Sequence, residues 1–234
     1  MKYERILIKL SGEALLGSRQ SGIDPEVAHF IAQEIKEVQE LGIKVAVVVG
    51  GGNIYRGGSS FEKDGIEETS AHYMGMLAIT MNTFALNDLF NSFGLPTQAL
   101  SALGKIGPMQ NYSIEAGNKV LTEDKVLLLA GGSGRPFVTS DSGAAIRAKE
   151  LELDVIFKVT KVDGVYDSDP MTNPDAKKFS TITFAEALEK NLKVMDREAF
   201  ETCQKSNIPI IVFKMDAGNI KKAAEGKEIG TTVQ

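Results

Sequence analysis

The sequence has few of the residues that build disulfide frameworks, zinc sites and base-stacking surfaces. Its 234 residues contain one cysteine, two histidines and no tryptophan, and aromatic residues make up 7% of the chain. The lone Cys203 cannot form an internal disulfide, and it argues against a cysteine-based zinc site. The scarcity of aromatic rings argues against a surface on which nucleic-acid bases stack.

An excess of basic residues is also lacking. The chain has 26 Lys and Arg against 31 Asp and Glu, so its net charge is −5. Nucleic-acid-binding proteins usually carry a basic surplus, and we therefore expect no nucleic-acid partner. No apolar run approaches the roughly 18 residues of a membrane span, and the N-terminal run is too short for a signal peptide. We expect a cytoplasmic protein that makes no contact with a membrane.

What the chain does have is a regular alternation of apolar strands and amphipathic helices. Strands are predicted at 5–10, 44–49, 97–101, 126–130, 155–159 and 208–213, and helices at 25–41, 70–93, 140–151, 184–190 and 196–206. Near-continuous apolar strands that alternate with helices are typical of a mostly parallel sheet covered on both faces. No linker or repeat divides the chain, so we expect one α/β domain over residues 1–234.

The first unusual strand end is the segment Lys9-Leu10-Ser11-Gly12. In open α/β sheets, ligands bind at the carboxyl ends of the strands. A lysine in a strand buried on both faces is costly unless an anion meets it. The alternative is a lysine that simply reaches solvent.

Two further strand ends are rich in glycine. Residues 50–52 are three successive glycines, with Arg56 four positions later, and successive backbone N–H groups in such a turn form an anion-binding nest. A sharp turn alone explains one or two glycines. Residues 131–136 (Gly-Gly-Ser-Gly-Arg-Pro) lead into a predicted helix N-terminus, which suits phosphate. Asp141 there is either an N-cap or a partner of Lys9 or of a hydrated Mg²⁺.

Several catalytic motifs are missing from the sequence. There is no G-x-x-x-x-G-K-[ST], which excludes a P-loop kinase, and no G-x-G-x-x-G after a strand, which argues against a dinucleotide dehydrogenase. Neither histidine belongs to a hydrolase motif. Phosphate cradles without a general base fit an acceptor that is itself a phosphate, because its second pKa is about 6 and it is already mostly dianionic. Positioning and charge neutralisation would then carry catalysis.

Motifs along almost the whole chain resemble those of the bacterial uridylate (UMP) kinases, a branch of the amino-acid kinase superfamily. They are Ile-Lys-Leu-Ser-Gly-Glu at 8–13, Gly-Gly-Gly-Asn at 50–53 with Arg56, Met-Gly-Met-Leu-Ala at 74–78 with Met81-Asn82, Thr-Lys-Val-Asp-Gly-Val-Tyr at 160–166, Asp169-Pro170, and Lys-Val-Met-Asp at 193–196. The resemblance implies a three-layer αβα sandwich that assembles as a homohexamer. It also implies ATP + UMP → ADP + UDP with Mg²⁺ in pyrimidine nucleotide biosynthesis, regulated by GTP as activator and UTP as inhibitor. Residues 17–22 match the region that contributes to GTP activation in Gram-negative members.

The same resemblance implies the roles of individual residues. Lys9 and Arg56 would neutralise the transferring phosphoryl group, Asp141 would orient the basic residues, and Asp196 would organise Lys9. The residues implied on the ATP side are Lys9, Leu10, Ser11, Gly12, Gly52, Arg56, Thr160, Tyr166 and Asp169. Those implied on the UMP side are Gly51, His72, Ser133, Gly134, Arg135, Pro136, Phe137, Val138, Thr139 and Ser140. No residue is implied as a metal ligand, and without the resemblance residues 160–169 read only as a turn-rich connection.

One position departs from the family pattern. His72 stands where the family typically has an Asp that accepts hydrogen bonds from the ribose of UMP. A neutral imidazole has one acceptor and one donor, so it replaces only part of a carboxylate's role. The alternative is a tolerated surface residue at a helix start.

Other patterns have simpler interpretations. A helical stripe of Met74, Leu77, Ala78, Met81, Phe84 and Ala85 predicts either core or a subunit interface. Cys203 is expected to be a small buried residue and His29 a solvated one.

Two rival functions remain open at this point. One is a sister kinase of the superfamily that phosphorylates a carboxylate such as acetylglutamate or glutamate. The other is a catalytically silent module that binds nucleotides or oxyanions, although Lys9, Arg56 and Asp141 argue against it.

Overall fold

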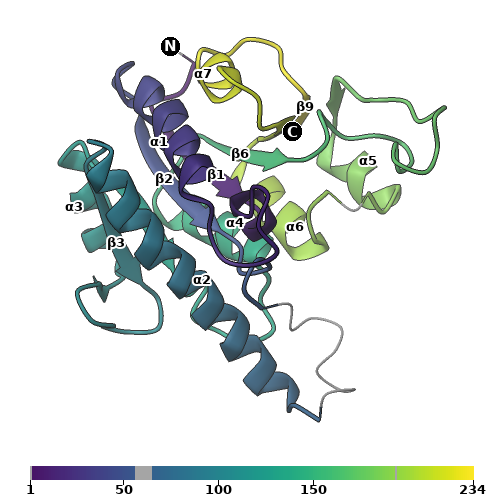
Figure 1. The fold of residues 1–234 in the computed structure, drawn as a ribbon. Coiled ribbons are helices and arrows are strands. Elements are labelled where there is room, and N and C mark those ends of the chain that lie inside the picture. The colour runs from purple at the N-terminus through teal and green to yellow at the C-terminus, as the bar shows by residue number, and fades with distance from the viewer. Residues whose placement is uncertain (1, 56–64, 193) are drawn as a thin grey trace.

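Within residues 2–55, 65–192 and 194–234, which a computed structural model describes, the chain forms a nine-stranded sheet (Figure 1). The strands are β1 (Arg5–Leu10), β2 (Lys44–Val49), β3 (Thr97–Ser101), β4 (Gln110–Asn111), β5 (Val126–Ala130), β6 (Val155–Thr160), β7 (Thr181–Ile182), β8 (Ile210–Lys214) and β9 (Thr231–Val233). Their spatial order is β4-β3-β5-β2-β1-β6-β8-β9-β7, and within the described sheet the pairing is parallel except between β8 and β9. The predicted mostly parallel α/β sheet is confirmed.

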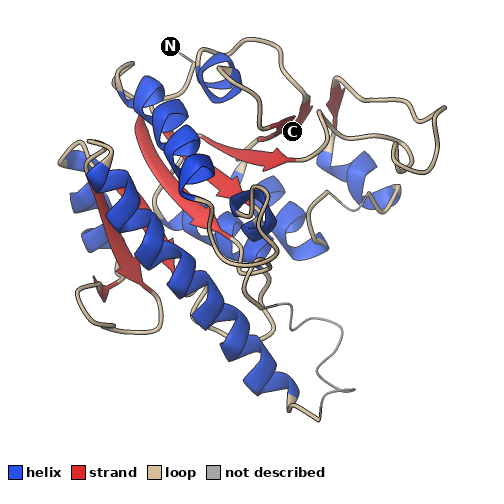
Figure 2. Ribbon diagram, viewed as in Figure 1, coloured by secondary structure: helices blue, strands red, loops and turns tan. Residues whose placement is uncertain are grey.

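Helices cover both faces of this sheet (Figure 2). They are the 3₁₀ helix η1 (Gly12–Leu15) and the α-helices α1 (Pro25–Gln39), α2 (Glu68–Ser92), α3 (Ile114–Thr122), α4 (Ser140–Glu150), α5 (Phe184–Glu189), α6 (Arg197–Ser206) and α7 (Asn219–Ala224). None of these described helices combines the length and apolarity that crossing a bilayer requires.

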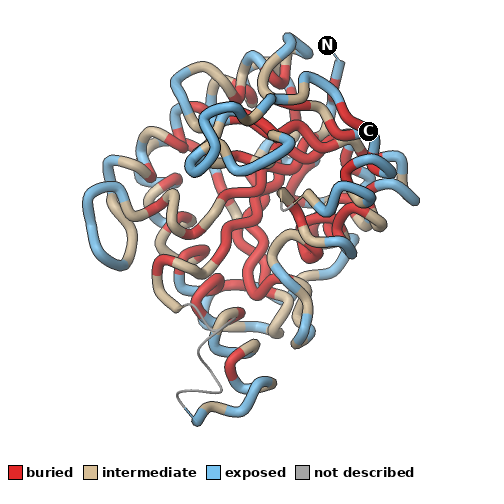
Figure 3. The backbone as a smooth tube through the Cα atoms, turned by 90° about the vertical axis from the view of Figure 1, so that its right-hand side faces the viewer, coloured by how far each residue is buried: buried red, intermediate tan, exposed pale blue. Residues whose placement is uncertain are grey.

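Alternation along the central strands divides the core into two halves. Ile6, Ile8 and Leu10 of β1 pack with α1, α2 and α7, whereas Leu7 of the same strand packs with α3, α4, α5 and α6. Successive strand residues point to opposite faces, so a strand that is apolar throughout must be covered twice. Figure 3 shows the result as buried strands through the middle of the molecule and exposed chain around them. The predicted three-layer arrangement is confirmed.

Most predicted elements are confirmed, with small shifts at their ends. Glu67 caps α2, which begins at Glu68 rather than at residue 70, because the Glu67 side chain accepts from the Ser70 N–H at 3.0 Å. Asp24 caps α1 and Pro25 is its first residue, as expected. The sequence patterns did not predict α3, α7 and the strands β4, β7 and β9. Those strands have two or three residues, too few for a periodic pattern to appear.

Two buried asparagines join α2 to the turn that follows β2. The Asn82 amide donates to the Gly50 carbonyl at 2.8 Å and to Asn53 Oδ1 at 2.7 Å, and Asn53 donates to Asn82 Oδ1 and to the Gly22 carbonyl, each at 2.8 Å. Asn82 is fully buried and Asn53 nearly so. Because buried amides are costly when unpaired, this reciprocal pair fixes the glycine turn against both α2 and the loop that ends at Gly22.

We predict that Asn82→Leu lowers the free energy of unfolding by about 2–4 kcal/mol, because it leaves Asn53 Oδ1 and the Gly50 carbonyl buried without the Asn82 amide that donates to both. Urea denaturation provides the measurement. Asn87→Leu on the same helix is the matched control, since Asn87 donates only to its neighbour Asp88 at 3.4 Å, and it should change stability by less than about 0.5 kcal/mol. Equal losses in the two variants would contradict this role of Asn82.

Candidate active site

Three of the predicted loops meet at the carboxyl ends of the central strands. The Gly50 N–H donates to the Leu10 carbonyl at 2.9 Å, which joins the ends of β1 and β2. A Cβ on Gly12 would lie 2.5 Å from Asn53 Oδ1 and 2.6 Å from the Gly50 carbonyl, so only glycine permits this approach. A Cβ on Gly50 would lie 3.8 Å from Ser140 Oγ, which places the start of α4 at the same point. The segments 10–12, 50–53 and 139–141 therefore surround one location.

A cluster of three charged side chains lies under these loops. The Asp141 carboxylate forms two ion pairs. Lys9 Nζ lies 2.7 Å from Asp141 Oδ1, and Lys158 Nζ lies 2.5 Å from Asp141 Oδ2. The three side chains are 17%, 8% and 12% exposed, respectively. Lys9 is thus a buried, paired lysine, and the simpler interpretation of a strand-end lysine in solvent is wrong. Asp141 is not the N-cap of α4 either, because Thr139 Oγ1 accepts the N–H groups of Asp141 and Ser142.

Burial and the charges of this cluster shift the pKa values of Asp141 and Lys158. Burial raises the pKa of the Asp141 carboxyl, but the charges of Lys9 and Lys158 outweigh it and hold that pKa below its ordinary value. Burial lowers the pKa of Lys158; the Asp141 carboxylate opposes that effect, whereas the charge of Lys9 adds to it. Asp141 is therefore a carboxylate at neutral pH, and each of its oxygens is in an ion pair with one lysine.

Asp196 contacts α4 rather than Lys9. Its Oδ1 caps α6 by accepting the Ala199 N–H at 2.9 Å, and it accepts the Ser142 hydroxyl at 2.6 Å; Oδ2 accepts the Thr139 hydroxyl. Among the described residues Asp196 makes no direct contact with Lys9, so its predicted role in organising Lys9 would act through α4 and stays a prediction. Asp196 joins the first turn of α6 to the first turn of α4. Because that turn of α4 carries Asp141, Asp196 affects the cluster through the position of α4.

The second glycine-rich loop follows β5 and is held from beneath by Arg147. The buried Arg147 guanidinium donates to the Gly132 carbonyl at 3.1 Å and to Glu150 at 2.5 Å, and it lies 4.0 Å from the Tyr112 ring centroid. Gly134 has φ +77°, and a Cβ there would lie 2.7 Å from the Ala102 carbonyl. The loop is consequently fixed in a conformation that only glycine adopts easily.

His72 lies against the predicted acceptor stretch 133–140. Its ring centroid is 4.7 Å from that of Phe137, and Nε2 is 4.0 Å from Glu68 Oε1. Phe137 has φ +63°, a conformation costly for a residue with a Cβ, and its side chain is exposed. The structure thus brings His72 together with Phe137, one of the residues that the resemblance assigns to UMP. Arg135 and Thr139 in this stretch are exposed, and Ser133, Gly134, Pro136, Val138 and Ser140 are half-buried.

Four of the residues predicted for the ATP side line two cavities. Tyr166 and Asp169 line one of about 530 Å³, in which the Tyr166 hydroxyl donates to Asp163 at 2.6 Å. Ser11 and Thr160 line another of about 350 Å³, with apolar residues of α1 and β6. Gly51 and Gly52 are half-buried in the turn after β2. Arg56 lies outside the described residues, as does Lys193, and their predicted roles stay predictions.

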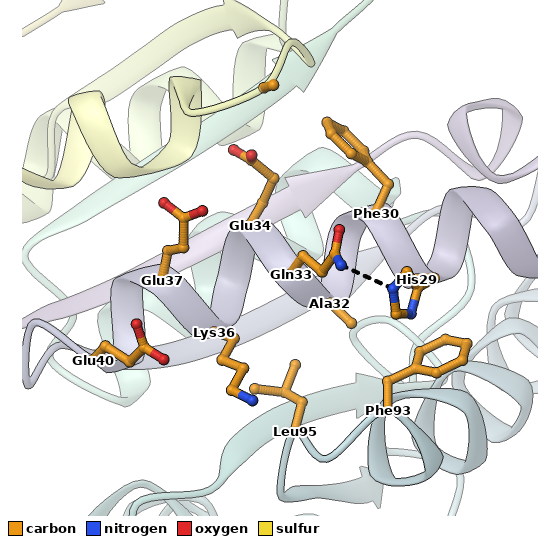
Figure 4. Close-up of a pocket in the computed structure, with 11 residues that line it drawn as sticks. His29, Phe30, Ala32, Gln33, Glu34, Lys36, Glu37, Glu40, Phe93 and Leu95 are labelled. Carbon is orange, nitrogen blue, oxygen red and sulfur yellow. Dashed lines mark hydrogen bonds between the residues drawn. The ribbon is translucent and has the colours of Figure 1, made fainter.

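A further cavity of about 560 Å³ is lined by α1, the end of α2 and Ala217 (Figure 4). No predicted site residue lines it. Its most buried acid, Glu34, accepts the Gly218 N–H at 2.7 Å and so anchors the loop before α7.

Three parts of this site were not predicted from the sequence: Lys158, the Asn53–Asn82 pair and Arg147. Lys158 had a signal, because it is a lysine at the fourth position of an apolar strand, the feature that drew attention to Lys9. The roles of Asn82 and Arg147 had none, since both depend on contacts between elements far apart in the sequence.

We predict that Asp141→Asn changes how stability depends on pH. A carboxyl whose pKa is lowered in the folded state stabilises the fold above its unfolded-state pKa, and the effect fades as pH falls through the folded pKa. The natural protein should therefore be more stable than the variant at pH 7, and the difference should shrink from about pH 5 downward. Urea denaturation at several pH values measures it, and a difference that stays constant down to about pH 3 would argue against an ion-paired Asp141.

Comparison with known proteins agrees with this geometry. The model of the amino acid kinase family matches residues 4–214. The structure of UMP kinase from Bacillus anthracis superimposes with a TM-score of 0.95 at 31% identity, over 100% of this chain and 97% of that one. UMP kinase from Ureaplasma parvum gives 0.92 at 38% identity over the whole of both chains. Uridylate kinase from Archaeoglobus fulgidus gives 0.77 at 26% identity, over 98% and 99% of the two chains. With its converging glycine loops and its lysine–aspartate cluster, the chain belongs to the amino acid kinase family.

Proposed function

We propose that this protein transfers the γ-phosphoryl group of ATP to UMP and releases ADP and UDP, as one enzyme of pyrimidine nucleotide biosynthesis in the cytoplasm. The observation that carries the proposal is the cluster of Lys9, Asp141 and Lys158 beneath glycine loops that converge at the strand ends. Matches to two UMP kinases over nearly their whole length support UMP as the acceptor.

The cluster suits a reaction between two phosphates. Asp141 is ion-paired with two lysines and Asp196 accepts hydrogen bonds from protein groups, which leaves neither free to act as a general base. A UMP phosphate needs none, because it is largely dianionic near neutrality. The protein's task is then to bring two anions together, with Lys9 and Arg56 offsetting the charge and backbone N–H groups of 10–12 and 50–52 orienting the phosphates.

We expect Mg²⁺ to bind here together with ATP rather than to be held by protein side chains alone. Among the described residues, no group of three or more His, Cys, Asp or Glu side chains could hold a metal, and the Asp141 carboxylate is held by two lysines. Mg²⁺ bound with a nucleotide keeps most of its ligands from phosphates and water. When bound, it would neutralise phosphate charge.

The outer face of α2 supports assembly as a homohexamer. Tyr73, Met74, Leu77 and Met81 are 44%, 38%, 50% and 57% exposed, whereas Ala78 is buried. Of the predicted stripe, Met74, Leu77 and Met81 lie outside the core, and a contiguous apolar helix face in water favours the other predicted alternative, an interface. In the hexamer, α2 would pair with a second copy of the chain.

Regulation by GTP as activator and UTP as inhibitor is supported by the resemblance of residues 17–22. In the structure this loop is exposed along most of its length and ends at Gly22, which exchanges hydrogen bonds with Asn53. An effector on the loop would therefore act on the glycine turn through Asn53.

An acceptor panel tests the proposed function. With ATP and Mg²⁺, a coupled ADP-release assay should give rapid turnover with UMP and little with CMP, dTMP or acetylglutamate. Lys9→Ala is the control for the site and should lower kcat by about 100-fold or more, because a direct charge on the reacting group is lost. Turnover with acetylglutamate alone would identify a carboxylate kinase, and ATP binding without ADP release would identify a silent binding module.

We predict that His72 weakens discrimination between UMP and dUMP. The ratio of KM for dUMP to KM for UMP should be smaller in the natural protein than in His72→Asp, because a carboxylate accepts from both ribose hydroxyls. Identical ratios in the two proteins would dismiss His72 as a ribose contact.

A further inference from the structure

Lys158 lies beside Lys9 on the sheet. The two lysines are register partners in the parallel strands β1 and β6, so both side chains leave the same face. That face is the one covered by α4 and α6. The N-terminal turn of α4 brings the Asp141 carboxylate between the two ammonium groups, at 2.7 Å and 2.5 Å.

The charges of the cluster do not cancel. Two lysines and one aspartate leave one net positive charge in a place that is almost closed to solvent. Without Lys158, the pair of Lys9 and Asp141 would be neutral. The second lysine therefore adds a positive charge to the field at the strand ends, against the negative charges of Asp141 and the nearby Asp196.

Lys158 is not explained as a stabilising residue. Asp141 already has Lys9 as a partner, and a further ammonium must be taken out of water beside a like charge. The pKa of Lys158 is lowered, first by burial and then by Lys9, against the effect of Asp141 and Asp196. A lysine whose pKa falls on folding makes the folded state less stable at neutral pH, which is typical of a residue that serves a site.

We propose that Lys158 is a positioning residue for phosphoryl transfer, which fixes one oxygen of Asp141 and thereby leaves the charge of Lys9 available to the nucleotide phosphates. The proposal rests on the kinase function proposed above. It assigns Lys158 no contact with the substrate, because its partner is Asp141.

Steady-state kinetics with ATP, Mg²⁺ and UMP test this role. Lys158→Met should lower kcat by about 10- to 100-fold, less than the loss of a direct contact with the reacting group, and KM should change less than about threefold. Lys158→Arg keeps the charge and should stay within about fivefold of the natural protein. Lys44→Met is the matched control, a strand lysine paired with Asp124 at the opposite end of the sheet, and it should leave kcat unchanged.

A double-mutant cycle separates action through Asp141 from an independent role. In the Asp141→Asn background, Lys158→Met should lower kcat by less than about threefold, because the charged carboxylate that Lys158 positions is no longer present. Equal losses in both backgrounds would overturn the proposal, and so would a kcat within about twofold of the natural protein for Lys158→Met. Its thermal midpoint should be unchanged or higher, which a purely structural lysine would not give.

Failure of the kinase assignment would be recognised separately. If the natural protein turns over a different acceptor, the same variants are compared with that acceptor. If none is turned over, NMR titration of the Lys158 ε-carbon, assigned with Lys158→Arg, still tests the cluster. Its pKa should lie below that of an ordinary lysine and fall further in Asp141→Asn. An ordinary pKa in both proteins would overturn the proposal.

Discussion

The ion cluster around Asp141 is the interaction on which the site depends. A carboxylate with two occupied oxygens cannot rotate freely, so it defines where two lysines from neighbouring strands end. The cluster also links three elements, because β1, β6 and α4 each supply one member. Since α4 is in turn joined to α6 through Asp196, a displacement of either helix would disturb the charge at the strand ends.

Close backbone approach is the second requirement of this arrangement. The loops after β1 and β2 come so near that Gly12 has no room for a Cβ, and the Asn53–Asn82 pair holds the glycine turn from the other side. Helix α2 thus has two different faces. Its buried side carries Asn82 and fixes the turn, and its outer side is apolar and exposed.

A net-negative protein can hold phosphates because the positive field is local. The chain carries a charge of −5, yet the strand ends concentrate two lysines, one carboxylate and the N-terminus of α4. The overall negative charge does not exclude small anionic ligands. Gathering these charges in a buried place lowers the pKa of Lys158, chiefly through burial.

The sequence by itself determined the fold class and the positions of the loops. Apolar strands such as 5–10 and 126–130 had to be covered on both faces, and the glycine runs had to follow them, because these are local consequences of residue type. Only the tertiary structure decided that Asp141 pairs with Lys9 and Lys158, that Asp196 contacts Thr139 and Ser142, and that Met81 is exposed. Those outcomes depend on strand register and helix placement, which bring together residues up to 132 positions apart, and no local pattern encodes that geometry.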